Sequence, residues 1–448
     1  MGKLFGTDGI RGVSFKEPIT QKTAFKLGRA VLNYVARRGK NLRVVLGRDT
    51  RESGLQLEHS IVSGILTGGG EVLVTGQLPT PAVALLTREN NAGAGIVISA
   101  SHNPYEYNGF KLFSDEGYKL SEEEENEIEE LMDEAPDTKQ EGQLGRHEIL
   151  KNASLQYESF LKKTMKENFS IRGMKIVLDC ANGATWQSAP RIFKTLGGEI
   201  EALAVTPNGK NINRDCGSEH TDALKERVIA TKADAGLAFD GDGDRLVAVD
   251  ERGASLTGDQ IIAICARMLK SKGKLKNDLV VSTIMSNMGL GIALRKIGVN
   301  LTTTDVGDRH VMEEMRARNA ILGGEDSGHI IFSDHHTTGD GLISALQLLT
   351  AVTESGSKLS ELTGFMKIFP QTLINVRVTH KPEIKSMTGI SSVISNVKKR
   401  LGNKGRVLVR YSGTEPLCRV MVEGETEEET SHMAADIASA IEKKIGIR

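Results

Sequence analysis

Aromatic side chains are scarce in this sequence, making up 4% of its 448 residues, with a single tryptophan. This scarcity argues against stacking platforms for nucleic-acid bases. The formal net charge is only −1, so no global basic field favours nucleic acid or a membrane surface as a partner. Hydrophobic residues (39%) and charged residues (26%) are in ordinary globular proportion. The length suits about two to four domains.

Cysteines are also few, and the four of them are scattered without the spacing of a metal site. Cys180 and Cys265 lie in apolar runs, so we expect reduced core thiols there. No apolar run approaches the length needed to span a bilayer. The first residues contain no signal-peptide core. These features predict a cytoplasmic protein.

The first third of the chain alternates between helical and extended patterns. Apolar residues recur at helical spacing over 20–38, and a further helix is expected over 57–66. Short β-rich runs at 42–46, 71–74 and 94–98 are predicted strands. Such alternation is typical of an α/β domain with a largely parallel sheet.

An acidic helix is predicted over 121–135, where Ser121 and Glu124 can form a capping box. Residues 135–147 mix proline, glycine, glutamine and charges, and we interpret them as a linker. The strand–turn–helix pattern then restarts at 175–179 and again at 279–283. Three related α/β domains are therefore expected.

The character of the chain changes after about residue 370. Strands are predicted over 373–378, 405–409 and 418–422, and Thr426 with Glu429 should cap a last helix that ends at Ile445. This pattern favours a smaller α+β domain. The predicted domains are 1–150, 151–253, 254–368 and 369–448.

The strongest chemical signal is the run Asp240-Gly-Asp242-Gly-Asp244-Arg245 between two apolar runs that resemble strands. Glycine lets such a loop fold back sharply, so three carboxylates can converge on one hard cation such as Mg²⁺. One alternative is a solvated acidic turn. Another is an EF-hand calcium loop, because Glu251 completes a partial match, but Arg245 occupies the obligatory glycine position and the flanks are not helical.

Two further polar loops follow predicted strands. Ser99-Ala-Ser101-His-Asn-Pro104 comes directly after the strand 94–98, where ligands bind in open α/β sheets, and Lys111 lies close by in the sequence. A serine there can act as a nucleophile or carry a phosphate, although a simple turn is the plain alternative. Glu325 and Ser327 alternate along a predicted extended loop and suit sugar hydroxyls or an amine.

Histidines accompany the second of these loops. His329 can serve in proton transfer. His335 and His336 are adjacent, and adjacent histidines rarely chelate one ion, so we interpret them as part of a solvated loop.

The fourth signal is Arg410-Tyr-Ser412-Gly-Thr-Glu-Pro416, in which an arginine, hydroxyls and exposed backbone suit a phosphate. The N-terminal Gly6-Thr-Asp-Gly-Ile-Arg11-Gly12 is a second glycine-rich stretch with an arginine.

These four motifs, in this order and over essentially the whole chain, resemble the α-D-phosphohexomutase superfamily. Within it, the opening residues and the serine loop are most similar to the bacterial phosphoglucosamine mutases. The resemblance implies three similar mixed α/β domains and a C-terminal α+β domain around a central cleft. It also implies an isomerase that needs Mg²⁺ and a phosphorylated serine.

The resemblance implies a role for each matching residue. Ser101 would be the phosphoserine, and its phosphate together with Asp240, Asp242 and Asp244 would hold Mg²⁺. Charge stabilisation and proton transfer would come from Arg11, Lys111, Arg245 and His329. Glu325 and Ser327 would bind the sugar. The non-reacting phosphate would be held by Arg410, Ser412, Gly413, Thr414 and Arg419.

The implied reaction interconverts glucosamine 6-phosphate and glucosamine 1-phosphate through a 1,6-bisphosphate, on the route to UDP-N-acetylglucosamine and cell-wall precursors. Tyr411, Asp326 and His310 depart from the expected motifs, which keeps a phosphomannomutase or phosphoglucomutase open as the runner-up. A metal-dependent sugar phosphatase is the more remote alternative. We expect a phosphosugar as the small-molecule partner, neither nucleic acid nor membrane, and allow for a homodimer.

Overall fold

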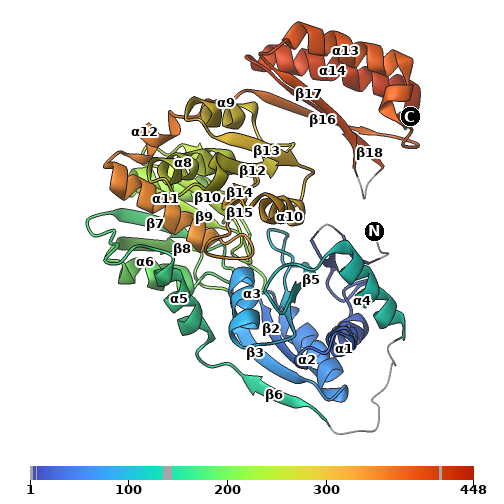
Figure 1. Ribbon diagram of the computed structural model, residues 1–448, viewed down its shortest axis with the longest axis vertical. Coiled ribbons are helices and arrows are strands. Elements are labelled where there is room, and N and C mark those ends of the chain that lie inside the picture. The colour runs from blue at the N-terminus through green and yellow to red at the C-terminus, as the bar shows by residue number, and fades with distance from the viewer. Residues whose placement is uncertain (1–3, 7, 135–143, 413–415, 448) are drawn as a thin grey trace. The chain divides into compact units, whose positions relative to one another are not determined.

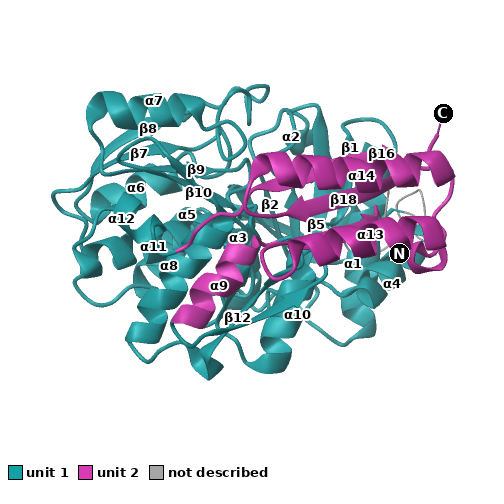
Figure 2. Cartoon of the chain, turned by 90° about the horizontal axis from the view of Figure 1, so that it is seen from above, with its two compact units in different colours: residues 1–285, 297–365 teal, residues 286–296, 366–448 magenta. Residues whose placement is uncertain are grey.

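The computed structural model describes residues 4–6, 8–134, 144–412 and 416–447 (Figure 1). The chain forms two compact units, coloured separately in Figure 2. Unit 1 comprises residues 1–285 and 297–365, and unit 2 comprises residues 286–296 and 366–448.

The first sheet of unit 1 has the strand order β1-β5-β4-β2-β3-β6. Its central strands are parallel, whereas β5 runs antiparallel to both β4 and β1. The strands are β1 (Ile10–Val13), β2 (Arg43–Arg48), β3 (Glu71–Gln77), β4 (Ala94–Ile98), β5 (Tyr107–Ser114) and β6 (Arg146–Ile149).

Helices cover this sheet because its strands are apolar on both faces. Val44, Leu46 and Ile96 share one buried core with three helices: α1 (Gln21–Arg37), α2 (Gly54–Thr67) and α4 (Glu122–Glu134). The helix α3 (Thr80–Glu89) packs on β2 and β4 as well. The predicted elements of this region are therefore confirmed.

The predicted capping box at α4 is also confirmed, since Ser121 N donates to Glu124 Oε2 at 2.8 Å and Glu124 N donates to Ser121 Oγ at 3.3 Å. The predicted linker is partly wrong. Residues 135–143 lie outside the described residues, but Arg146 and His147 begin β6, which pairs in parallel with β3. All four residues of this edge strand are exposed and only one is apolar, so its sequence contains no alternation that would predict a strand.

Two further sheets complete unit 1, in the orders β11-β10-β9-β7-β8 and β13-β12-β14-β15. Their strands are β7 (Lys175–Asp179), β8 (Glu199–Leu203), β9 (Ala235–Phe239), β10 (Leu246–Asp250), β11 (Ser255–Leu256), β12 (Leu279–Thr283), β13 (Asn300–Thr304), β14 (Leu322–Gly324) and β15 (Ile330–Phe332). The accompanying helices are α5 (Ala153–Lys163), α6 (Ser188–Thr195), α7 (Asp222–Thr231), α8 (Gly258–Ser271), η1 (Lys276–Asp278), α10 (Asp308–Arg318), α11 (Gly341–Ser355) and α12 (Leu359–Thr363).

Unit 2 is built on the antiparallel sheet β16-β18-β17, whose one face is covered by two helices (Figure 1). Its elements are α9 (Met288–Lys296), β16 (Gln371–Arg377), η2 (Ile384–Ser386), α13 (Thr388–Leu401), β17 (Arg406–Tyr411), β18 (Leu417–Glu423) and α14 (Glu427–Ile445). The Thr426 side chain accepts a hydrogen bond from Glu429 N at 3.3 Å, as predicted for the last helix. Three α/β sheets followed by an α+β unit match the predicted architecture.

The helix α9 belongs to unit 2 although it follows β12 of unit 1 in the chain (Figure 2). Asn287 Nδ2 donates to the Phe369 carbonyl at 2.9 Å, and Met288 N donates to Glu423 Oε1 at 3.3 Å. Arg406 also donates to the Ser286 carbonyl. Unit 2 is therefore assembled from two segments that are distant in the sequence.

Two predictions from composition can be compared with the structure. No helix in the described part of the chain is long and apolar enough to cross a bilayer. All four cysteines are buried and free, which confirms Cys180 and Cys265 as core thiols.

Candidate active site

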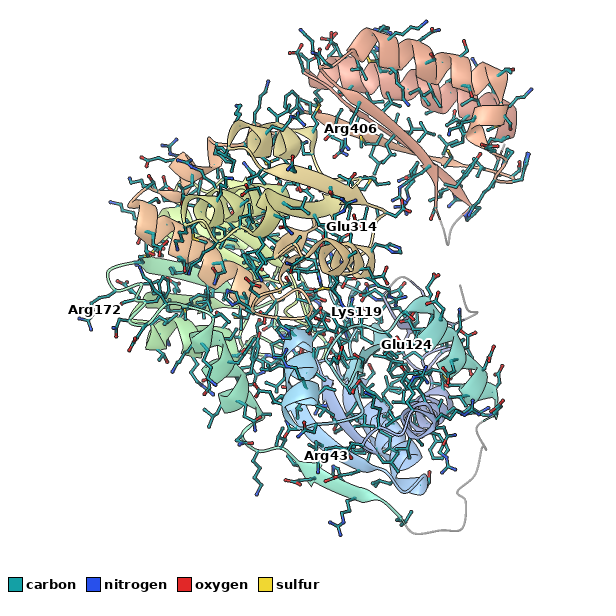
Figure 3. All side chains as sticks on the ribbon, viewed as in Figure 1. Arg43, Lys119, Glu124, Arg172, Glu314 and Arg406 are labelled. Carbon is teal, nitrogen blue, oxygen red and sulfur yellow. The ribbon has the colours of Figure 1, made fainter. Side chains whose placement is uncertain are left out.

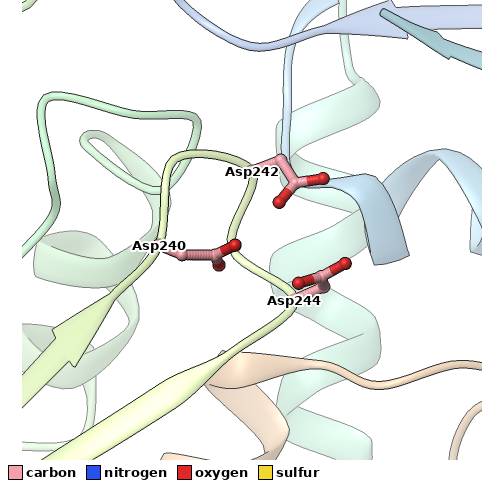
Figure 4. A group of neighbouring side chains, drawn as sticks. All are labelled: Asp240, Asp242 and Asp244. Atoms are coloured by element: carbon pink, nitrogen blue, oxygen red, sulfur yellow. The ribbon is translucent and has the colours of Figure 1, made fainter. Parts of the chain in front are cut away.

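Three carboxylates converge in the tight turn between the antiparallel strands β9 and β10 (Figure 4). Asp240, Asp242 and Asp244 are buried, and ligand atoms from the three lie within 4.8 Å of one another. Glycine is required in this turn: a Cβ at Gly241 would lie 2.5 Å from the Ser101 carbonyl, and Gly243 has φ +75°. The two glycines thus permit both the turn and its close approach to the serine loop.

The carboxylates differ in their electrostatic surroundings. Burial, reinforced by Asp244 and Asp242, raises the pKa of Asp240 well above its usual range. Burial also opposes the charge of Asp244, but Lys111 and His329 outweigh it and lower the pKa of Asp244 well below the usual range. Before any cation binds, Asp240 therefore holds its proton more readily than Asp244 does.

The turn fits a divalent cation. Asp242 Oδ1 and Asp244 Oδ1 are buried, and no group in the described part of the chain donates a hydrogen bond to either. Buried anionic oxygens without donors are costly unless a cation neutralises them, and hard cations prefer carboxylate oxygens. The flanking strands, together with Arg245 at the glycine position of an EF-hand, exclude the calcium-loop alternative.

Ser101 lies against this turn, in the loop after β4. Its Oγ donates to Asp240 Oδ2 at 2.5 Å, and its side chain is buried. The backbone at Ser101 has φ +51°, in the left-handed region that favours glycine. Next to it, His102 Nδ1 lies 3.3 Å from Ser101 Oγ, and burial together with Arg245 lowers the pKa of His102 to about 4.

Lys111 reaches the same carboxylates from β5, where it pairs in register with Val97 of β4. Its Nζ lies 2.8 Å from Asp242 Oδ2, 3.0 Å from Asp244 Oδ2 and 3.3 Å from Asp8 Oδ2. Burial opposes its charge, but these carboxylates outweigh it and raise the pKa of Lys111. Lys111 is therefore a cation throughout the physiological pH range.

Arg11 approaches the serine loop from β1. Its guanidinium forms an ion pair with Asp8, and NH1 donates to Asn103 Oδ1 at 3.2 Å and to the Ala100 carbonyl at 3.4 Å. Arg245 contacts the site through its backbone N, which donates to Asp240 Oδ1 at 3.1 Å. The side chain of Arg245 reaches Glu219 at 3.7 Å.

A ring of alternating charges joins the first sheet to the third. Lys119, which is labelled in Figure 3, has its Nζ 2.5 Å from Asp8 Oδ1 and 2.6 Å from Asp308 Oδ2 at the start of α10. His329 continues the ring, with Nε2 3.2 Å from Asp308 Oδ2 and Nδ1 3.7 Å from Asp244 Oδ1. Although burial opposes it, these two carboxylates raise the pKa of His329, which favours the protonated imidazolium.

The sugar-binding candidates lie in a turn, not in the predicted extended loop. Gly328 N donates to the Glu325 carbonyl at 3.0 Å, which closes the turn directly after β14. The Glu325 side chain is half-buried and accepts from Gly307 N at 3.0 Å, whereas Ser327 is exposed. Burial, with Asp308 nearby, raises the pKa of Glu325.

The arginine motif lies in unit 2. Arg410 and Arg419 are register partners on β17 and β18, so the two cationic side chains lie on the same face of the sheet. Arg410 is the penultimate residue of β17, not part of the loop as predicted. Ser412 N donates to the Leu417 carbonyl at 2.9 Å, while the predicted phosphate ligands Gly413 and Thr414 lie outside the described residues.

Sequence reasoning gave no role to several residues of this site. Asp8 belongs to the N-terminal glycine-rich stretch and Asp308 begins α10, and only the fold brings both to Lys119. Thr80 Oγ1 donates to Asp242 Oδ2 at 2.6 Å across 162 positions of sequence. Lys381 in unit 2 donates to the Ser412 carbonyl at 2.6 Å. Such contacts between distant segments have no local sequence signal.

Comparison with known proteins places these motifs in a family. Four segments match the phosphoglucomutase/phosphomannomutase family: alpha/beta/alpha domain I over 2–139, domain II over 156–253, domain III over 257–369 and the C-terminal domain over 373–440. The chain belongs to this family of phosphohexomutases, which confirms the predicted superfamily and fold class.

Curated relatives match over the full length. The phosphoglucosamine mutases of Syntrophus aciditrophicus and Syntrophobacter fumaroxidans are each 49% identical, over 100% of both chains. Among solved structures, a phosphoglucomutase/phosphomannomutase family protein from Burkholderia thailandensis aligns with a TM-score of 0.80 at 23% identity, covering 98% of this chain and 99% of that one. An Aspergillus fumigatus N-acetylphosphoglucosamine mutase, solved with GlcNAc-6P and magnesium, has a TM-score of 0.68 at 17% identity and covers 98% and 95%.

Proposed function

We propose that this protein interconverts glucosamine 6-phosphate and glucosamine 1-phosphate, with Ser101 as the phosphate carrier and Mg²⁺ as the metal. The observation that carries the chemistry is the contact of Ser101 Oγ with Asp240 Oδ2 at 2.5 Å, beside two further buried carboxylates. The choice of amino sugar rests on the full-length similarity to the relatives named phosphoglucosamine mutase.

The proposed reaction runs in two half-reactions. In the first, the bond between phosphorus and Ser101 Oγ breaks as phosphorus bonds to O1 of glucosamine 6-phosphate; the O1 hydroxyl gives its proton to a base, and the released Ser101 Oγ takes up a proton. The 1,6-bisphosphate then turns around. In the second, Ser101 Oγ gives its proton to a base and bonds to the 6-phosphoryl group as the bond between phosphorus and O6 breaks, and O6 takes up a proton to release glucosamine 1-phosphate.

The protein's own residues supply charge and position for this transfer. Lys111 and Arg11 place two cations beside the serine loop, where negative charge spreads over the phosphoryl oxygens. His329, held between Asp308 and Asp244, can deliver or accept a proton. Mg²⁺, held by Asp240, Asp242, Asp244 and the phosphate on Ser101, would supply further electrostatic stabilisation when bound.

Binding of the substrate would divide between two regions. We assign Glu325 to the sugar, because a half-buried carboxylate can pair with a C2 ammonium, and Ser327 to a ring hydroxyl. Arg410, Arg419 and Ser412, with Gly413 and Thr414, would hold the phosphate that is not reacting. Arg410 and Arg419 place two cationic side chains on one face of a sheet, which suits an anionic ligand.

The decisive experiment compares kcat/KM for the phosphates of glucosamine, glucose and mannose side by side. A preference for glucosamine phosphate supports the proposal. A preference for mannose or glucose phosphate would instead identify the protein as a phosphomannomutase or phosphoglucomutase, two activities of the same family. Stoichiometric release of inorganic phosphate instead of isomerisation would indicate a sugar phosphatase.

A cytoplasmic location fits the four buried free thiols. The domain boundaries predicted from the sequence and the homodimer stay predictions. Analytical ultracentrifugation at micromolar concentration tests the homodimer directly.

A further inference from the structure

One buried arginine binds the backbone of the serine loop at four places. Arg51 NH2 donates to the carbonyls of Ser101 at 2.9 Å and Asn103 at 2.8 Å. NH1 donates to the Tyr107 carbonyl at 2.9 Å and to that of Pro104. The Arg51 side chain is 0% exposed, and its contact with the Ser101 carbonyl is fully buried, whereas the other three contacts are partly buried.

The same arginine is oriented by a carboxylate that also binds the loop. Arg51 Nε lies 2.8 Å from Asp49 Oδ2, and the same oxygen accepts from Ser99 Oγ at 2.6 Å. Ser99 Oγ in turn accepts from Ser101 N at 2.9 Å. Asp49, Arg51 and Ser99 therefore bind both the amide and the carbonyl of Ser101.

A second donor approaches from the other side of the loop. Asn213 Nδ2 donates to the carbonyls of Ser101 at 2.9 Å and Asn103 at 3.0 Å. Ser101 thus has donors from two segments on its carbonyl and an acceptor on its amide. A non-glycine residue with φ +51° is strained and persists only where its surroundings fix it.

We propose that Arg51 is a positioning residue, which holds Ser101 in this left-handed conformation and so directs its Oγ toward the aspartate turn. The inference rests on the proposed role of Ser101. An arginine needed only for stability has no reason to bind four carbonyls of one catalytic loop, residues 101 to 107. The planar guanidinium of Arg51 offers several N–H donors in fixed directions, so it can bind several carbonyls at once. A lysine ammonium is a compact point charge and cannot replace this arrangement.

The primary test is Arg51→Lys, which keeps the positive charge for Asp49 but loses the planar guanidinium. We expect kcat to fall by about a hundredfold, because a misplacement of about 1 Å can have that effect. KM should change less than threefold, because Arg51 does not face the sugar in this scheme, and circular dichroism should show a folded protein. An Arg51→Lys enzyme with the wild-type kcat would overturn the proposal.

The matched control is Arg43→Lys. Arg43 begins β2, the strand that precedes Arg51, and it contacts Glu71 at 3.0 Å and donates to the Asn90 carbonyl at 2.9 Å, neither of which belongs to the serine loop. It should lose thermal stability as Arg51→Lys does, but keep its kcat. If both variants lose kcat equally per folded molecule, the role of Arg51 is merely structural.

Asn213→Ala keeps the proposal testable if Arg51→Lys does not fold. It removes two hydrogen bonds to the same carbonyls, and we expect about a tenfold lower kcat with an unchanged KM. An unchanged kcat would contradict the proposal that these hydrogen bonds position Ser101. Ser101→Ala separates the two hypotheses. If this variant stays active, the proposed role of Ser101 is wrong. If it is inactive while Arg51→Lys is fully active, only the positioning role of Arg51 is wrong.

Discussion

The aspartate turn of unit 1, residues 240–244, concentrates negative charge. The arginine hairpin of unit 2, strands β17 and β18 with Arg410 and Arg419, concentrates positive charge. In the turn, three buried carboxylates face Lys111, and two of their oxygens receive no hydrogen bond from the described part of the chain. In the hairpin, two cations lie side by side on half-buried strands. The difference suggests that the first region fixes reacting atoms, while the second grips a phosphate that must be released and rebound. The predictions below test this division.

Ser101→Ala should break the first region most completely. The substitution deletes one hydroxyl and leaves the loop's backbone contacts in place, so we expect a folded protein with nearly all mutase activity lost. Intact mass should show one phosphate on the active wild type and none on the variant. Ser188→Ala, which also removes a buried hydroxyl from unit 1, should remain active. A fully active Ser101→Ala enzyme contradicts the mechanism.

Asp242→Asn should be the next most severe change. Replacing an anionic ligand with a neutral one weakens attraction for a hard cation, so kcat should fall by about a hundredfold and the magnesium requirement should rise. Asp250→Asn, a buried carboxylate in β10 outside the turn, should keep the wild-type requirement. Wild-type turnover that survives EDTA would show that the turn holds no essential metal.

Arg410→Ala tests the second region. A charge-assisted hydrogen bond contributes on the order of 1.5–3 kcal/mol to binding. Its loss should therefore lower kcat/KM roughly ten- to a hundredfold. The 1,6-bisphosphate should also escape more often, which can be measured by trapping it during turnover. Arg377→Ala, an exposed arginine of the same sheet, is the control. Unchanged kinetics for Arg410→Ala would remove the hairpin from the site.

Glu325→Gln sharpens the substrate assignment. The variant keeps the shape but removes the charge, so it should harm the amino sugar more than glucose 1-phosphate, by roughly five- to thirtyfold. The ratio of kcat/KM for the two sugars measures this effect within one preparation. Equal losses would mean that Glu325 recognises only ring hydroxyls.

The smallest expected effect concerns stability and pH. Burial raises the pKa of Asp340 to about 7, and Tyr157 Oη donates to its Oδ2 at 2.8 Å. The folded state therefore keeps a proton that the unfolded state loses near its ordinary pKa, and this stability is lost as pH rises toward about 7. Asp340→Asn should flatten the fall in melting temperature between about pH 4 and 7. Parallel slopes for the variant and wild type would contradict this.

How far the sequence predicts this molecule depends on how local each signal is. The runs around 94–98 and 235–239 are apolar and bounded by polar turns, so their strands were predicted correctly. The aspartate turn was found because its ligands are two positions apart. Arg51 was missed because it acts on carbonyls some fifty positions away, and carbonyls leave no mark in a sequence.

Packing also overturned one local interpretation. His336 was expected in a solvated loop, yet it is 1% exposed and its Nε2 contacts the Pro81 carbonyl at 2.9 Å. Burial lowers its pKa to about 4, so it is a neutral core residue. A pair of adjacent histidines in the sequence cannot reveal that the distant helix α3 contacts one of them.

The membership of α9 in unit 2 bears on the order in which the chain can fold during synthesis. The ribosome makes Asn287 and Met288 long before their partners Phe369 and Glu423 emerge. In a chain made from its N-terminus, α9 therefore emerges before its partners in unit 2 exist. A ribosome stalled near residue 366 should hold a nascent chain whose α9 is cut by protease, and release of the full chain should protect it.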